Sequence, residues 1–332
     1  MLRGDLIEQV RAVLARAGFT VSDRCDLRPV SFDLVARRAK DLVMVKVLGN
    51  VDALSEPIAV EIKVLCKFLD ARPILVGLRA GAGALEDGVV YNRHDIPIMT
   101  PATLEQYVLH GEAPMVFAAP GGFYVHLDAE RLRRAREQMQ VSLGVMAQIA
   151  GVSRRAIQMY EEGMSASIDA AMRLEEALQS ELIRPMDPFT AFDPSRFAAP
   201  QSAAGSEDPL QSAVRRMLES LGYEVRPTNR SPFNALSTPE SDAPGPKPAN
   251  TLLTGMGEES PQLKRRARVV TSLSRVTGRP GFFIVERTTR TSLEGTPIVT
   301  REELRRLDDP AAVLDLILAR QSAAQRDAQD DA

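Results

Sequence analysis

Cysteine and histidine are scarce in this chain of 332 residues, which has two cysteines and three histidines. Cys25 and Cys66 are too few for the disulfide framework of a small secreted domain, so we expect a reducing compartment, the cytoplasm. The histidines stand far apart, at positions 94, 110 and 126. Because a zinc site needs several clustered ligands, we expect no metal site and no cofactor.

Long apolar runs and an excess of one charge are also missing. No stretch of 18 apolar residues occurs, and the N-terminus lacks the apolar core of a signal peptide, so we expect no membrane span. The chain has 41 basic and 44 acidic residues, a formal net charge of −3. This balance argues against non-specific coating of nucleic acid but permits a local basic face.

Residues 1–118 predict an α/β domain. Apolar residues recur with helical spacing in some segments, and other segments are short, apolar and rich in β-branched residues. We expect, in order, a helix at 5–17, strands at 31–37 and 41–48, a helix at 57–69, strands at 73–78 and 89–100, and a helix at 101–111.

A later segment repeats this pattern. At a constant offset of 204 residues, Leu6, Val10, Leu14, Gly18 and Val21 match Leu210, Val214, Leu218, Gly222 and Val225. Further on, Arg72-Pro73 matches Arg279-Pro280, and "IPIMTPATL" matches "TPIVTREEL". The order of these matches predicts a duplicated, diverged α/β domain at 209–320.

Composition distinguishes the connecting segments. Residues 190–208 include "APQSAAGSED" and predict a linker. Residues 237–250 contain four prolines and predict a flexible loop within the second α/β domain. We expect 321–332 to be a disordered tail.

Residues 126–186 predict four short helices. Each helix follows a residue that can cap it, and these residues are Asp128, Ser142, Ser153 and Ser167. Gly151 can form the turn after the second helix, and Gly163 can end the third.

This segment resembles the helix-turn-helix of the XRE (lambda-repressor/Cro-like) family. The resemblance depends on fixed spacing between Met146, Ala147, Gly151, Val152, Ser153, Ile157, Tyr160, Glu161 and Gly163. It implies a lambda-repressor-like domain that binds double-stranded DNA, with the recognition helix 153–162 in the major groove.

Two adjacent arginines begin the recognition helix. The helix dipole disfavours Arg154 and Arg155 there, but phosphates and guanine edges would compensate. The resemblance implies that Arg154, Arg155 and Met159 face the bases and that Gln158 reaches base or phosphate. Ser142 and Ser153 would contact the DNA backbone. The alternative is that the arginine pair lies on a solvated helix face.

The first helix of this segment also carries arginines. Two interpretations remain open for them: contact with phosphate, or ion pairs with Glu130 and Glu137. The arginines are Arg131, Arg133, Arg134 and Arg136.

The N-terminal domain resembles the restriction-endonuclease-like fold, which gives an alternative function, a metal-dependent nuclease of the PD-(D/E)xK type. Asp33 and Lys46 fit two of the motif's positions. Met44 stands where the second acid is needed, and a methionine cannot replace a carboxylate ligand of Mg²⁺. In the second copy Asn234 stands where Asp33 does, and no lysine matches. We therefore predict an inactive domain and no enzymatic activity. Asp33 would then make a strand-end hydrogen bond, and Lys46 would be an edge residue whose ammonium group reaches solvent.

The complete arrangement is a central helix-turn-helix between two restriction-endonuclease-like α/β domains. It resembles a group of archaeal HTH-type transcriptional regulators over the whole length. The resemblance implies a sequence-specific DNA-binding regulator, and we interpret the flanking domains as dimerisation or sensing modules. We expect a homodimer held by those domains, because the helix-turn-helix surface is small and charged. The sequence does not reveal the operator, the effector, or whether the protein activates or represses.

Overall fold

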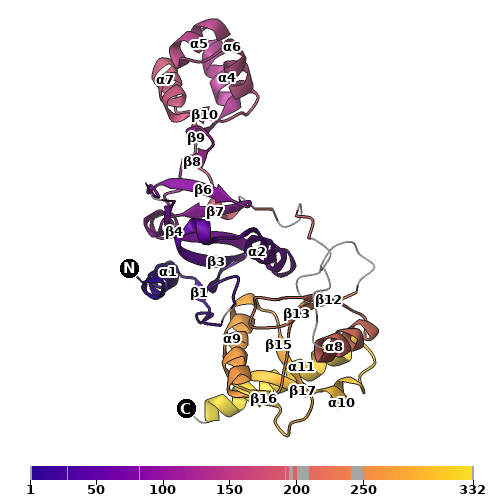
Figure 1. Cartoon of the computed structure of the whole chain (residues 1–332). Coiled ribbons are helices and arrows are strands. Elements are labelled where there is room, and N and C mark those ends of the chain that lie inside the picture. Colours follow the sequence, from indigo (N-terminus) through magenta and orange to yellow (C-terminus); the bar gives the residue numbers. More distant parts are fainter. Residues whose placement is uncertain are drawn as a thin grey trace.

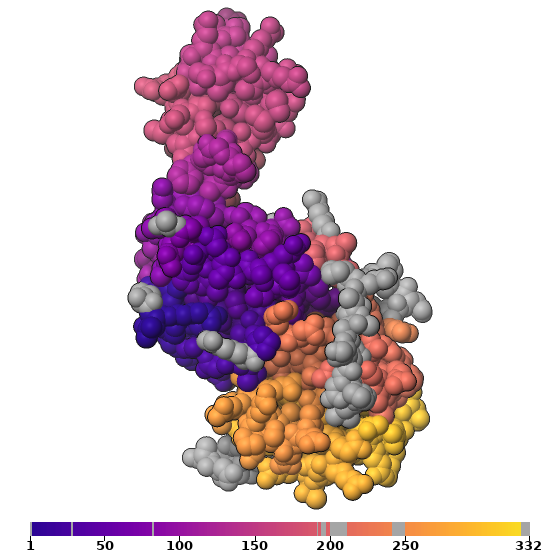
Figure 2. Space-filling model, in the orientation of Figure 1, coloured from indigo at the N-terminus to yellow at the C-terminus, as the bar shows by residue number. Residues whose placement is uncertain are grey.

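The structure is a computed structural model that describes residues 2–27, 29–81, 83–190, 192–193, 197–199, 209–240 and 250–330. It contains an N-terminal α/β unit (2–111), a central helical unit (128–182) and a C-terminal α/β unit (209–330) (Figure 1). Figure 2 shows the two α/β units in broad contact, whereas the helical unit projects beyond them on a narrow stalk. Within the described ranges, no helix has the length and hydropathy needed to cross a membrane.

The N-terminal unit is a mixed sheet with a helix on each face. The first helix, α1 (Arg3–Arg16), packs on one face, and α2 (Glu56–Leu69) packs on the other. The strands lie in the order β1 (Thr20–Val21), β2 (Leu34–Arg38), β3 (Asp41–Asn50), β4 (Arg72–Ala80), β7 (Ile96–Met99) and β6 (Val89–Arg93). A short pair, β4 with β5 (Gly83–Ala84), lies at one end, and α3 (Pro101–Glu105) runs on as a π-helical turn, Gln106–His110. The helices and strands expected from the sequence are confirmed here.

The C-terminal unit has the same sheet order. Its elements are α8 (Pro209–Ser220), β12 (Tyr223–Pro227), β13 (Ala235–Pro239), β14 (Leu252–Met256), α9 (Pro261–Thr277), β15 (Gly281–Val285), β16 (Ser292–Leu293), β17 (Thr296–Thr300), α10 (Arg301–Leu304) and α11 (Pro310–Asp330). The order β12-β13-β14-β15-β17-β16 repeats β1-β2-β3-β4-β7-β6 with the same parallel and antiparallel pairings. Gly18 and Gly222, matched in the sequence, both follow a first helix with positive φ, 80° and 87°.

The two α/β units share one apolar core. It joins α2 and β3 of the first unit to α9 and β14 of the second. Arg37 on β2 donates to the carbonyls of Val276 and Thr277, both at 2.6 Å, and so satisfies the C-terminal end of α9. The backbone amide of Ser31 donates to the carbonyl of Arg230 at 2.8 Å. These contacts fix the two units against each other.

The helical unit contains α4 (Ala129–Gln138), α5 (Leu143–Ala150), α6 (Arg154–Glu161) and α7 (Ile168–Leu178). The four predicted caps are confirmed: Asp128, Ser142, Ser153 and Ser167 each accept the amide three residues on. Gly151 adopts φ 70°, which permits the turn between α5 and α6. Leu132, Met146, Ile157 and Leu174 are fully buried and form its core.

A β-hairpin forms the stalk between the helical unit and the N-terminal unit (Figure 1). Its strands are β8 (Val116–Ala119) and β9 (Gly122–Leu127). β8 pairs with β6, and β9 pairs with β10 (Ala166–Ser167) and β11 (Ile183–Arg184) of the helical unit. Phe117 stacks on Tyr124 and His126 across the hairpin. The sequence analysis assigned no element to this hairpin.

The predicted linker at 190–208 is described only at 190, 192–193 and 197–199. Within it, Phe192 is buried in the shared core. Lys67 donates to the carbonyl of Phe197 at 2.6 Å, and the ammonium of Lys63 lies 5.1 Å from its ring centroid. The two phenylalanines hold this stretch on the α/β units because their burial is favourable.

The predicted flexible loop and disordered tail need correction. Residues 237–239 belong to β13, where Ser237 and Thr238 are buried and pair with threonines of the neighbouring strand. Residues 241–249 lie outside the described residues. The tail is helical to residue 330 because α11 continues through it, and Ile317 and Ala324 pack inward. Residues 331–332 are not described.

Candidate nucleic-acid interface

The recognition helix α6 has one buried face and one exposed face. Ile157 and Tyr160 pack into the core of the helical unit. The exposed side chains line one hollow at the surface, and they are Arg154, Arg155, Gln158, Met159 and Glu162. The four recognition-helix residues predicted to contact DNA therefore lie together on one open face.

Arg154 and Arg155 have no hydrogen-bonding or ion-pair partner among the described residues. Gln158 makes only a local contact, donating to Glu162 at 3.3 Å. Two guanidinium groups at the first turn of a helix are disfavoured by its dipole. The described residues supply nothing to offset this, so an external anion is the partner that the arrangement can accept.

The arginines of α4 have partners within the chain. Arg136 forms a 2.5 Å ion pair with Glu161, and this hydrogen bond raises the pKa of Arg136. Arg133 donates to the carbonyl of Glu161 at 3.0 Å. Arg131 bonds the hydroxyl of Ser180 at 3.1 Å, and Arg134 pairs with Glu130. The predicted ion pairs are confirmed for Arg134 with Glu130 and for Arg136, which lies 3.5 Å from Glu137 but pairs more closely with Glu161. They are not found for Arg131 and Arg133, which bond other groups.

Ser142 and Ser153 lie at the starts of α5 and α6. The hydroxyl of Ser142 accepts the amide of Val145 at 3.2 Å, and that of Ser153 accepts the amide of Ala156 at 3.1 Å. Both residues are exposed. A hydroxyl that accepts one hydrogen bond can still donate its own proton. Either serine can therefore cap its helix and donate to a phosphate at the same time.

Arg173 on α7 is a candidate that sequence reasoning missed. An ideal Cβ built on Gly151 would lie 2.7 Å from its Nη1 atom, so the guanidinium sits over the turn between α5 and α6. The side chain is exposed and has no partner among the described residues. The sequence places Arg173 among acids on the fourth helix, and only tertiary packing brings it beside the recognition helix.

Asp33 and Lys46 meet in the N-terminal unit, where both are buried. Oδ1 of Asp33 lies 2.5 Å from Nη2 of Arg3, and Oδ2 accepts the amide of Val47 at 2.8 Å. Nζ of Lys46 lies 3.8 Å from Oδ2 and donates to the carbonyl of Val30 at 2.9 Å. The strand-end hydrogen bond predicted for Asp33 is confirmed. The predicted exposure of Lys46 is wrong, because its ammonium group finds two acceptors inside the fold, and burial lowers its pKa.

Met44 occupies the position where the nuclease motif needs an acid. It is buried against α2, and its Sδ atom lies 4.0 Å from Sγ of Cys66. Across the part of the chain that the structure describes, no three His, Cys, Asp or Glu side chains cluster as metal ligands would. Asp33 therefore contacts cations of the chain itself rather than a second carboxylate.

Asn234 is the counterpart of Asp33 in the C-terminal unit. Its backbone amide donates to the carbonyl of Thr254 at 2.8 Å, as the backbone amide of Asp33 donates to the carbonyl of Val45. Its Oδ1 accepts the amide of Met256 at 2.8 Å, as Asp33 accepts that of Val47. The correspondence expected from the sequence is confirmed by these shared hydrogen bonds.

Comparisons with known proteins match two parts of the chain to families. A PD-(D/E)XK superfamily domain matches residues 3–114, and a helix-turn-helix family matches residues 132–183. No solved structure matches the chain significantly.

Curated relatives match nearly the whole chain. A protein of Halorubrum lacusprofundi is 40% identical over 97% of this chain and 99% of its own length. One of Halobacterium salinarum is 41% identical over 96% and 98%, and one of Methanococcoides burtonii is 40% identical over 93% and 94%. All three are named "Putative HTH-type transcriptional regulatory protein". The chain belongs to this family of HTH-type transcriptional regulatory proteins, with an XRE-type helix-turn-helix at 132–183 and a PD-(D/E)XK superfamily domain before it.

Proposed function

We propose that the protein is a sequence-specific regulator that inserts α6 into the major groove of double-stranded DNA. The observation that carries the proposal is the pair of arginines at the first turn of α6, which have no partner among the described residues, beside an α4 whose arginines are bonded within the chain. Major-groove guanine edges and phosphates supply the acceptors that the pair lacks.

Each residue predicted to contact DNA has a proposed role. Arg154, Arg155 and Met159 face base edges, and Gln158 reaches base or phosphate. Ser142 and Ser153 contact the DNA backbone from the starts of two helices, where the dipoles favour phosphate. Arg173 adds a phosphate contact beside the turn.

We further infer that the two α/β units, 1–118 and 209–320, derive from one duplicated PD-(D/E)XK-like domain around the 126–186 module. The common strand order and the paired hydrogen bonds of Asp33 and Asn234 support this inference. The units serve dimerisation or sensing rather than catalysis, because the acid position is an apolar methionine. The compartment is the cytoplasm, in keeping with two free cysteines.

We also propose a homodimer, and the core shared by the two α/β units limits which surfaces can form its interface. The apolar faces of α2 and α9 are already covered within one chain. A second copy would therefore contact other surfaces of these units. Light scattering of the full chain tests this, and a monomer at all concentrations would contradict it.

Selection of bound duplexes from a random pool tests the DNA proposal. Full-length protein should enrich one sequence motif, and an Arg154→Ala, Arg155→Ala double variant should lose the enrichment. Arg134→Ala is the matched control, since Arg134 is paired with Glu130. Equal recovery of all sequences by the unaltered protein would contradict the proposal.

A further inference from the structure

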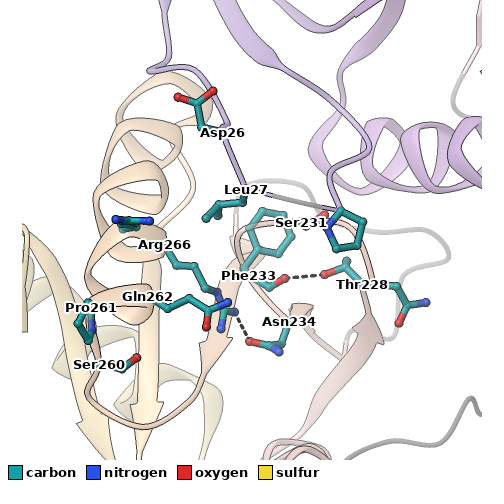
Figure 3. A pocket seen from close by; sticks show the side chains of 13 residues that line it. Asp26, Leu27, Thr228, Ser231, Phe233, Asn234, Ser260, Pro261, Gln262 and Arg266 are labelled. Carbon is teal, nitrogen blue, oxygen red and sulfur yellow. Dashed lines mark hydrogen bonds between the residues drawn. The ribbon is translucent and has the colours of Figure 1, made fainter.

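A cavity of about 740 Å³ lies where the two α/β units meet. Figure 3 shows Asp26 and Leu27 reaching it from the N-terminal unit. The segment from Thr228 to Asn234 and the start of α9 form the rest of its wall. The cavity thus belongs to neither unit alone, and it adjoins the site where Asn234 replaces the acid of the first unit.

Arg266 brings a partly buried positive charge to this wall without an anionic partner among the described residues. It donates to the carbonyls of Pro232 and Met256 at 2.8 and 3.1 Å, and to the side-chain oxygen of Asn234. All three acceptors are neutral. Burial lowers the pKa of Arg266. A cation that is partly withdrawn from water and has only neutral acceptors is stabilised when an anion binds to it.

The other charged groups of the wall do not neutralise Arg266. Arg265 is exposed at the cavity and has no partner in the described part of the chain. Among the described residues of the wall, Asp26 is the single acid, and its Oδ1 already lies 2.5 Å from Nε of Arg24. Arg265 therefore keeps all its N–H groups for a ligand. Three of the five N–H groups of Arg266 are used within the chain, so two remain. Planar guanidinium groups match phosphate oxygens well.

The size and remaining walls indicate an organic molecule rather than a bare ion. The volume falls in the range of sites for small molecules, about 300–1,000 Å³. Leu27 and Pro29 give an apolar side, and Gln262, Asn229 and Thr228 give polar groups. We propose that the cavity binds a phosphorylated small organic molecule, with its phosphate on Arg265 and Arg266 and its organic part against Leu27 and Pro29.

Such a ligand would join the two units. The loop that carries Leu27 and Pro29 leads to Ser31, whose amide and hydroxyl both donate to the carbonyl of Arg230. Binding would link this loop to α9, beside the existing link from Ser31 to Arg230 and next to the shared apolar core. The proposal goes beyond DNA recognition and can succeed or fail independently of it, since α6 lies in another part of the fold.

Calorimetry on the full-length protein, without DNA, tests the site. The probes are adenosine monophosphate, ribose phosphate, inorganic phosphate, adenosine and citrate, at matched ionic strength. We expect saturable binding of the organic phosphates, weaker binding of inorganic phosphate, and none of adenosine. Failure of both organic phosphates to bind saturably would overturn the proposal, and tighter binding of citrate would overturn the choice of phosphate.

Two variants on the same turn of α9 locate the binding. Arg265→Glu should weaken binding by about tenfold or more, because it replaces a phosphate contact by a like charge. Lys264→Glu makes the same charge change at an exposed residue outside the cavity wall and should leave binding unchanged. Equal weakening by both variants would mean general electrostatic attraction and would refute the site. Melting temperatures without ligand show that both variants are folded.

Discussion

The charged groups around Asp33 have partners within the fold, whereas those at the start of the recognition helix α6 do not have one among the described residues. Around Asp33, the carboxylate meets Arg3, Lys46 and the amide of Val47, so each of these charged groups has a partner inside the fold. On α6, Arg154 and Arg155 meet nothing among the described residues. The difference teaches that the first group of charges stabilises the fold, whereas the second is available to a partner outside the chain.

The C-terminal unit gives a third case. Asn234 keeps the hydrogen bonds of Asp33 but not its charge. Gly255 corresponds to Lys46, and a Cβ there would lie 2.2 Å from the ring of Phe283, so no lysine fits. Arg266 supplies the cation from α9 instead. The C-terminal unit therefore has the backbone arrangement found at Asp33 without the carboxylate and the lysine, which a catalytic role would require.

The largest expected effect is on the stability of the N-terminal unit. Asp33→Ala leaves the buried ammonium of Lys46 without its counter-charge, and removing one partner of a buried pair costs about 3–5 kcal/mol. Urea unfolding of the full chain measures the loss. Glu8→Ala on α1 breaks the exposed pair with Arg11 and should change stability by less than about 0.5 kcal/mol. Similar losses of stability from the two variants would contradict the conclusion that the charges around Asp33 stabilise the fold more than an exposed ion pair does.

The next effect is on DNA affinity, with stability unchanged. Arg155→Ala should cost about 1–3 kcal/mol on the preferred operator and relax its selectivity, because a guanine contact is lost. Fluorescence anisotropy on specific and random duplexes measures both. Arg131→Ala, whose side chain bonds Ser180, should cost much less. An equal loss on both duplexes would make Arg155 a phosphate contact instead.

Local signals in the sequence were sufficient for the four helices of the helical unit and for the main strands of the N-terminal unit, but not for the hairpin of β8 and β9. The caps at Ser142 and Ser153 and the turn at Gly151 depend on neighbouring residues, so spacing alone finds them. The partners of Arg136 and Lys46 depend on packing between distant segments and could not be predicted. The same holds for Arg173, which reaches Gly151 only through the fold, and for the cavity between the two units.

The cap of the recognition helix should give a smaller effect. Ser153→Ala removes the hydrogen bond to the amide of Ala156 and should cost about 0.5–2 kcal/mol of stability. Ser153→Asp keeps the cap but brings a negative charge to the DNA-facing end of α6. We expect it to restore stability while weakening operator binding, as unfolding and anisotropy measurements together would show. Full binding by the aspartate variant would exclude a phosphate near Ser153.

The smallest expected effect is on plasmid DNA, which we expect the protein not to cleave. Plasmid incubated with the protein and Mg²⁺ or Mn²⁺ should stay intact, because a two-acid metal site cannot form with Met44 in the acid position and Asp33 bonded to Arg3. An active metal-dependent nuclease in a parallel reaction shows that the assay would detect cutting. Asp33→Asn is the matched variant, since Asn234 demonstrates that an amide can keep the same backbone hydrogen bond. Cutting by the unaltered protein that disappears in Asp33→Asn would show that Asp33 is a catalytic residue.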